Sequence, residues 1–201
     1  LILAGGPPGG AYAAVAEVIA NALSSRDRGV AAVATEGSLD NLARLRNGSV
    51  DLAVVQSDLA ALARSGLGSF AGQPPMGGLR ALASLFPEAL HVVVRADAGI
   101  QSVRDLAGRR VDIGLPGSGT RVHALDVLAT AGLTPHDLAE AREEGLAAAL
   151  KALEAGRLDA FFATVHAPSP QIQRLAAKSR IRLLSLDENA IAGLRGEEPY
   201  L

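Results

Sequence analysis

The sequence predicts an α/β protein of two lobes, each with a mainly parallel sheet flanked by helices. The first observation is that short β-type runs alternate with helical patterns along the 201 residues. The second is a pattern of helix end, glycine, apolar residue, aspartate and buried strand, which occurs at 45–55 and again at 153–163. The copies lie about a hundred residues apart, where two similar lobes would place them. Two such lobes facing each other would form a cleft.

The predicted strands are short apolar runs, and the predicted helices have apolar residues three or four positions apart. The strands are expected at 1–4, 30–34, 52–55, 91–95, 110–115, 160–165 and 181–186. The helical stripes are Tyr12, Val15, Ile19 and Leu23; Leu39, Leu42 and Leu45; Val122, Leu125 and Leu128; and Leu146, Leu150 and Leu153. Helix-to-strand turns also produce the repeated pattern by chance, so the pattern alone does not establish homology between the halves.

Local signals mark the ends of several elements. Ser38 is expected to cap the second helix and Gly48 to end it. A capping-box-like start is expected at Ser102, and Thr134 is expected to cap a helix that opens with proline. Six glycines and prolines at 65–78 predict a surface loop. The acidic stretch 140–144 is interpreted as a solvated face.

Composition excludes several classes of protein. The chain is 49% apolar, which is ample for a core, and its net charge of -2 argues against a nucleic-acid partner. It has no cysteine, so a disulfide framework, a thiolate metal site and a cysteine nucleophile are excluded. No apolar run is long enough to cross a bilayer. Because the first residue is not Met, we expect a processed or trimmed product.

Two glycine-rich turns are candidate anion sites. The turn at 5–12 follows the first strand and opens the first helix, but its glycine spacing does not match a dinucleotide fingerprint, and a plain tight turn is the alternative. The turn at 116–120 is the stronger candidate, because Ser118 and Thr120 add hydroxyl donors to the N–H groups of a helix start. It lacks the lysine of a P-loop and the first glycine of a nucleophile elbow. A capped helix without a ligand is the alternative here.

The histidines do not favour catalysis or metal binding. None of the four is spaced as a metal ligand, so no metal site is expected. Ser118, His123 and Asp126 crowd one segment, but a triad needs an independently placed base and acid. His166 stands at the end of the second repeat's strand, where α/β folds place ligands, or is simply a loop histidine in water. Gln56 and Ser57 occupy the equivalent end in the first repeat, and Asp58 is expected to cap the next helix.

Taken in order, several segments resemble the TAXI family of solute-binding proteins, which are the extracytoplasmic receptors of TRAP transporters. The segments are 5–12, 36–42, 51–58, 79–88, 91–95, 116–120 and 156–162. The resemblance implies a type II periplasmic-binding (Venus-flytrap) fold that closes on a small carboxylated solute, such as an amino acid or organic acid. It implies a periplasmic or otherwise extracytoplasmic receptor without catalysis or cofactor, and membrane subunits of a TRAP transporter as its partner. A monomer is expected.

The resemblance also implies a set of ligand-binding residues, to which the strand-end argument adds His166. The set is Gly9, Tyr12, Ser38, Asn41, Gln56, Ser57, Phe86, Pro87, Ser118, Gly119, Thr120 and His166. The implied lobes are 1–90 and 91–183, with the break near 87–95, and 184–201 returns toward the first lobe and is truncated. Three features depart from the family: His166 replaces a small residue, 140–144 looks shortened, and the chain stops at Leu201.

Two other functions stay open at this point. The same fold could be the ligand-sensing input module of a membrane-anchored signalling protein, or an enzyme that reuses the cleft. The sequence shows no obvious pair of catalytic base and nucleophile, so it does not support the enzyme alternative. The identity of the solute is also open, because no arginine is clearly placed to clamp a carboxylate.

Overall fold

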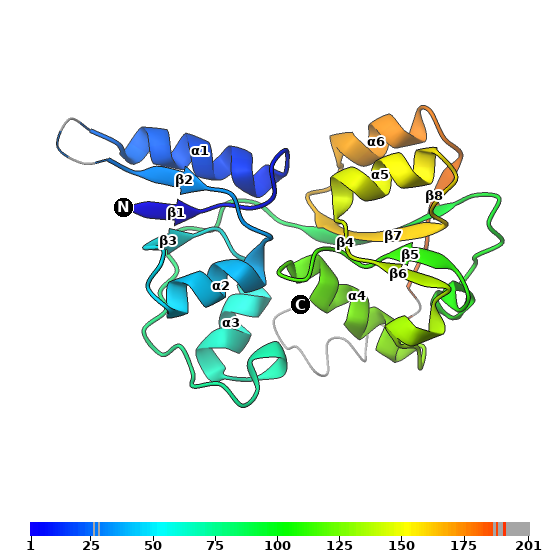
Figure 1. The fold of residues 1–201 in the computed structure, drawn as a ribbon, viewed down its shortest axis with the longest axis horizontal. Helices are drawn as coiled ribbons and strands as arrows, with labels where there is room; N and C mark the ends of the chain where they lie inside the picture. Colours follow the sequence, from blue (N-terminus) through cyan, green and yellow to red (C-terminus); the bar gives the residue numbers. More distant parts are fainter. Residues whose placement is uncertain (26, 28, 187, 189–190, 192–201) are drawn as a thin grey trace. The chain divides into compact units, whose positions relative to one another are not determined.

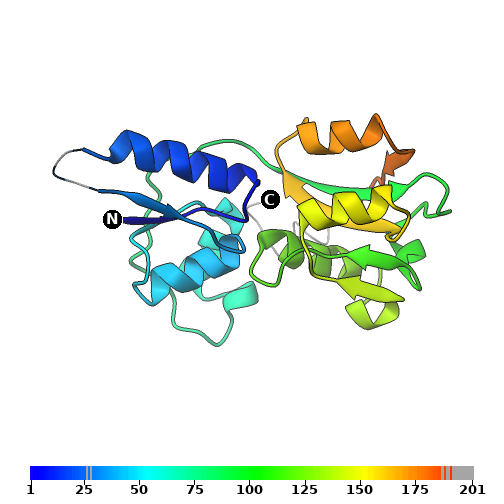
Figure 2. The same ribbon diagram turned by 45° about the horizontal axis from the view of Figure 1, so that its top comes forward.

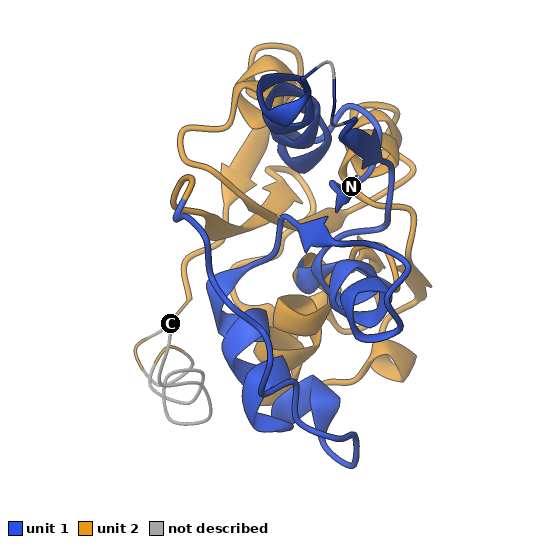
Figure 3. Cartoon of the chain, turned by 90° about the vertical axis from the view of Figure 1, so that its left-hand side faces the viewer, with its two compact units in different colours: residues 1–84, 117–119, 200 blue, residues 85–116, 120–199, 201 orange. Residues whose placement is uncertain are grey.

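A computed structural model describes residues 1–25, 27, 29–186, 188 and 191. These residues form two compact units (Figure 3). The first unit contains residues 1–84 and 117–119, and the second contains 85–116 and the described chain from Thr120 onward.

The first unit is a three-stranded parallel sheet with the order β2-β1-β3. Its strands are β1 (Ile2–Ala4), β2 (Ala31–Val33) and β3 (Leu52–Ala53). A helix follows each strand: α1 (Ala11–Leu23), α2 (Ser38–Arg46) and α3 (Ser57–Ser65). Helix α1 covers one face of the sheet, and α2 and α3 lie on the other (Figures 1 and 2). Leu3, Ala16, Ala20 and Val54 form the core beneath α1.

The second unit is a five-stranded mixed sheet with the order β6-β5-β7-β4-β8. Its strands are β4 (Ala89–Arg95), β5 (Arg110–Asp112), β6 (Glu140–Arg142), β7 (Ala160–Val165) and β8 (Ile181–Leu183). Its helices are α4 (Gly119–Thr130), α5 (Leu146–Glu154) and α6 (Pro170–Ala176). Short 3-10 turns occur at Gly68–Phe70 in the first unit and at Val103–Leu106 and Pro135–Asp137 in the second. The last two begin with capping boxes at Ser102, as predicted, and at Thr134, where only a cap before proline was predicted.

Strand β4 has a core on each of its faces. Val92 and Val94 pack with residues of α4, whereas Val93 packs with residues of α5 and α6. This alternation follows from the two-residue period of a strand. Because β4 is buried on both faces, its sequence is almost continuously apolar.

The repeated sequence pattern makes the same turn in both units. Asp51 accepts a hydrogen bond from the N–H of Ile2 at 2.7 Å, and Asp159 accepts one from the N–H of Arg110 at 3.0 Å. Asp51 therefore fixes the start of β1, and Asp159 fixes the start of β5. Each of these strands lies between two parallel neighbours. The glycines of the two copies, Gly48 and Gly156, have φ values of +73° and +70°, which L side chains rarely adopt.

Several local expectations were wrong. Ser38 is the first residue of α2 rather than its cap, and Asp58 lies inside α3, where it accepts a hydrogen bond from the N–H of Leu59. The stretch 140–144 is exposed as expected, apart from the half-buried Arg142, but it also contains the edge strand β6. Strand β4 pairs antiparallel with β7 and β8, so the second sheet is mixed.

The division of the chain differs from the lobes expected from sequence. The structural boundary falls after Ser84 instead of residue 90, and 117–119 counts with the first unit. Within 184–201, Leu184 is buried in the core of the second unit. Residues 187, 189–190 and 192–201, on which the expected return to the first lobe depends, lie outside the described residues. The assignment of lobes therefore stays a prediction.

Candidate functional site

Three helices of the first unit begin at the same edge of its sheet. The strands are parallel and each leads into a helix, so the N-termini of α1, α2 and α3 lie at the carboxyl edge of the sheet. Among the described residues, the N-caps Gly10, Gly37 and Gln56 make no side-chain capping hydrogen bond. Main-chain N–H groups at such helix starts attract anions, because the positive end of the helix dipole lies there.

Ser38 and Gln56 are among the buried polar side chains at this edge. Ser38 is 2% exposed, and its Oγ accepts the N–H of Gln56 at 3.1 Å. With that lone pair used, the serine hydroxyl keeps its hydrogen to donate. Gln56 is 8% exposed, and its Oε1 is buried without a hydrogen-bond partner among the described residues. A buried acceptor without a partner is costly, and only a hydrogen-bond donor, not an oxyanion, would satisfy it.

Asn41 has a role in the scaffold. It is 0% exposed, and its Nδ2 donates to the carbonyl of Gly5 at 2.6 Å and to that of Val54 at 2.7 Å. The amide therefore joins the ends of β1 and β3. Thr35, which the sequence analysis did not select, donates its hydroxyl to the same Gly5 carbonyl at 3.2 Å.

The segment Gly117–Gly119 fits closely against the start of α2 and the side chain of Gln56. A Cβ on Gly119 would lie 1.4 Å from Gln56 Oε1, so only glycine fits there while Gln56 keeps this position. A Cβ on Gly37, whose φ is +130°, would lie 3.2 Å from the Cα of Ser118. The first unit thus brings together four residues of the predicted set: Ser38, Gln56, Ser118 and Gly119.

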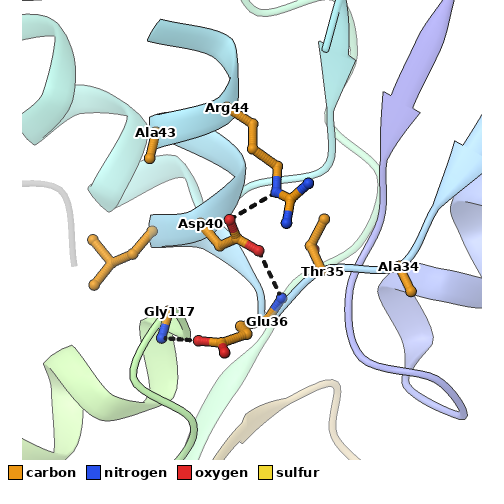
Figure 4. Close-up of a pocket in the computed structure, with 8 residues that line it drawn as sticks. Ala34, Thr35, Glu36, Asp40, Ala43, Arg44 and Gly117 are labelled. Atoms are coloured by element: carbon orange, nitrogen blue, oxygen red, sulfur yellow. Dashed lines mark hydrogen bonds and ion pairs between the residues drawn. The ribbon is translucent and has the colours of Figure 1, made fainter. Parts of the chain in front are cut away.

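A pocket of about 650 Å³ lies beside these residues in the first unit (Figure 4). It is lined by Ala34, Thr35, Glu36, Leu39, Asp40, Ala43, Arg44 and Gly117, none of them in the predicted set. Asp40 forms an ion pair with Arg44 at 2.7 Å and accepts the N–H of Glu36 at 3.1 Å. Burial opposes ionisation of Asp40, but the hydrogen bonds from Arg44 and Glu36 outweigh it and lower the pKa of the carboxyl.

In the second unit, the hydroxyl of Thr120 is hydrogen-bonded to strand β7. Its Oγ1 accepts the N–H of Thr164 at 3.1 Å, and His123 Nδ1 lies 2.9 Å from Thr164 Oγ1. Thr164 stands in the second repeat where Gln56 stands in the first. In both units, therefore, a hydroxyl at a helix start accepts a main-chain N–H from the equivalent position of the repeat. This position is Gln56 in the first unit and Thr164 in the second.

The other predicted residues lie on turns, helix starts and irregular connecting segments. Phe86 and His166 are in edge-to-face contact, with ring centroids 6.4 Å apart. Pro87 is exposed on the chain that leads to β4. Gly9 lies in the first turn with a φ of +79°, Tyr12 in the first turn of α1, and Ser57 at the start of α3.

Asp112, at the end of β5, is a buried group that the sequence analysis missed. It accepts the N–H of Gly114 at 3.0 Å and that of Glu144 at 2.9 Å, and thereby holds together the loops that follow β5 and β6. Burial raises the pKa of this carboxyl, although main-chain hydrogen bonds oppose the change. The sequence signal for this buried carboxylate is an aspartate at the end of an apolar strand, followed two residues later by glycine.

Among the described residues there is neither a cluster of metal-ligating side chains nor a helix fit to span a membrane. These residues contain no group of three or more His, Cys, Asp or Glu side chains placed to hold a metal ion. They also contain no helix with the length and hydropathy needed to cross a membrane.

Comparison with known proteins identifies the family. Residues 3–201 match the NMT1-like family. The chain belongs to the NMT1-like family.

Solved structures similar to this NMT1-like chain share its fold. The alkanesulfonate-binding protein SsuA from Xanthomonas axonopodis pv. citri, bound to MOPS, matches with a TM-score of 0.59 and 22% identity over 94% of this chain and 61% of that one. A protein from Bordetella bronchiseptica RB50 matches with a TM-score of 0.64 and 25% identity over 90% and 54%. A binding protein component of an ABC phosphonate transporter from Pseudomonas aeruginosa matches with a TM-score of 0.57 and 13% identity over 97% and 72%.

These matches confirm the predicted fold class. The α/β architecture is that of periplasmic binding proteins, and the two units agree with a two-lobed type II fold. Two of these proteins are named as binding proteins, one for alkanesulfonates and one as a component of a phosphonate transporter. The chain spans 61% of the SsuA protein and 54% of the Bordetella protein, less than two thirds of either.

Proposed function

We propose that this chain is an extracytoplasmic receptor that binds a small solute through an acidic group, without catalysis. The observation that carries the proposal is the carboxyl edge of the first unit, where three helices start without side-chain caps beside the Ser38 hydroxyl. Helix N–H groups and a hydroxyl left to donate can together bind an oxyanion. The family and fold support the proposal.

The shared chemistry of the solute is an oxyanion that accepts several hydrogen bonds. The sequence resemblance favours a carboxylate, whereas the SsuA protein and the Pseudomonas protein are named for sulfonate and phosphonate ligands. Carboxylate, sulfonate and phosphonate can all accept hydrogen bonds from a helix N-terminus. We therefore propose a small organic acid and leave the three head groups as arms of the test.

Binding should be measured by calorimetric titration with MOPS, methylphosphonate and acetate, and with glycerol as the uncharged control. We expect saturable binding of at least one acid and none of glycerol. Native mass spectrometry of freshly purified protein tests the same idea by looking for a retained acid. If no acid binds and only neutral molecules are retained, the proposal is wrong. Turnover of a bound acid would favour the enzyme alternative.

The proposed partner is the membrane part of a solute transporter. The resemblance to TAXI proteins predicts TRAP subunits, whereas the Pseudomonas protein is a component of an ABC transporter. Identification of the membrane subunits that co-purify with the receptor in the presence of its acid distinguishes the two types. Recovery of a signalling protein instead would favour the sensor alternative.

A further inference from the structure

We infer that Glu36 is a positioning residue for the anion-binding segment Gly117–Gly119. The inference rests on the proposed function, because it assumes that Ser118 and its neighbours bind the acid. Both polar groups of Gly117 are bound: its N–H donates to Glu36 Oε2 at 2.8 Å (Figure 4), and its carbonyl accepts the N–H of Asp40 at 3.1 Å. Glu36 thus supplies the only side-chain hydrogen bond to Gly117 found among the described residues.

A second set of contacts fixes Glu36 itself. Its main-chain N–H donates to Asp40 Oδ2 at 3.1 Å, while Asp40 Oδ1 is paired with Arg44 Nε at 2.7 Å. The next residue, Gly37, has a φ of +130°, which L side chains rarely adopt. This conformation turns the chain from Glu36 into α2. The carboxylate of Glu36 is therefore presented from a well-defined backbone.

The fit around Gly117 depends on close approach of main chain to side chain. A Cβ on Gly117 would lie 2.8 Å from the Cβ of Glu36 and 2.9 Å from the Cβ of Asp40. Because a Cβ atom is attached directly to the main chain, neither of these atoms can move away as the end of a flexible side chain could. Ser118 and Gly119 come directly after this fixed point, so the hydrogen bond from Gly117 to Glu36 sets where they begin.

The first test needs no ligand and follows amide hydrogen exchange of Gly117 by NMR in the wild-type chain and in Glu36→Ala and Glu36→Gln. We expect Glu36→Ala to speed the exchange at Gly117 about tenfold, because one hydrogen bond to the amide is lost. Glu36→Gln keeps an oxygen acceptor and should remain within about twofold of wild type. The control, Glu17→Ala on the exposed face of α1, should change nothing. Unchanged exchange in Glu36→Ala would overturn the inference.

The second test measures binding of MOPS, methylphosphonate and acetate to the same variants. For any acid that binds the wild-type chain, we expect Glu36→Ala to weaken binding about five- to tenfold and Glu36→Gln to restore it to within about twofold. Equal affinity in all four proteins would overturn the role in binding. If no acid binds the wild-type chain, the proposed function is wrong. Hydrogen exchange at Gly117 still tests whether Glu36 positions the segment.

Discussion

At the scale of single residues, the absence of a side chain at Gly119 makes room for Gln56. The Oε1 of Gln56 occupies the space in which a Cβ of residue 119 would stand. A buried amide held this way has one well-defined position, which suits a group that recognises a solute. The glycine is therefore required by its neighbour Gln56.

Gly119→Ala tests this fit. Gln56 or the segment must move, so we expect the free energy of unfolding to fall by about 1–3 kcal/mol, as for other overpacked sites, and acid binding to weaken. Urea denaturation and titration with MOPS measure the two effects. Gly77→Ala is the matched control, because a Cβ there meets nothing within 4 Å. Equal effects of the two substitutions would contradict the account.

Ser118 and Thr120 carry the hydroxyls of the predicted anion turn. Replacing both with alanine removes two donors and keeps the main-chain N–H groups, so binding should weaken without being lost. At about 1–1.5 kcal/mol for each hydrogen bond, we expect a ten- to hundredfold loss of affinity for the acid. Calorimetric titration measures it, with circular dichroism to show that the double variant is folded. Wild-type affinity would place the anion elsewhere.

At the scale of elements, the turn before β7 depends on one carboxylate. Asp159 accepts hydrogen bonds from Arg110 Nε and Nη2 at 3.0 and 2.6 Å, besides the main-chain N–H of Arg110. The hydrogen bond from Arg110 lowers the pKa of Asp159 against the opposing effect of burial. The folded state therefore favours the ionised carboxyl.

Asp159→Asn should lower the free energy of unfolding by about 2 kcal/mol at pH 7, since hydrogen bonds to a charged group are lost. A lowered native pKa means that the stabilisation is fully present above the ordinary carboxyl pKa of about 3.9 and is lost as pH falls through the native value. The difference between variant and wild type should therefore shrink as the pH is lowered from 7 to below the ordinary carboxyl pKa. Denaturation over this pH range measures it.

The matched control for this prediction is Asp97→Asn. Asp97 also pairs with an arginine, Arg95, at 2.9 Å, but its side chain is 70% exposed. Exposed ion pairs contribute little to stability, so the control should have a much smaller effect at pH 7. A loss as large as that of Asp159→Asn would contradict the role assigned to the turn.

At the scale of the whole molecule, the two units differ in how much core each can form. The first has three strands of two or three residues each, and its described residues include eleven buried apolar side chains, against twenty-four in the second. The second has five strands and a separate core on each face of β4. Small sheets with little buried surface are marginally stable by themselves.

We therefore expect a fragment of residues 85–186 to fold cooperatively and a fragment of residues 1–84 to be largely unfolded. Circular dichroism and urea denaturation of each fragment check this. The intact chain, measured in parallel, provides the reference. A cooperative transition in the shorter fragment, with none in the longer, would contradict the expectation.

The α/β fold class could be predicted from sequence because it rests on local periodicity. Strand and helix patterns and the caps at Ser102 and Thr134 each involve residues close along the chain. Strand β6 could not be predicted, because an edge strand with the sequence Glu-Ala-Arg has no apolar pattern. The role of Ser38 was also missed, since its partner Gln56 lies eighteen residues away.

The sequence by itself determined the fold class, the two glycine turns and the polar residues at strand ends, because turn chemistry and apolar spacing are local properties. Only the tertiary structure decided which of these groups meet. Glu36 holds Gly117 across 81 positions, Gln56 fills the space left by Gly119, and Asn41 joins two strand ends. Such contacts depend on how strands are ordered in a sheet, and no local pattern records that order.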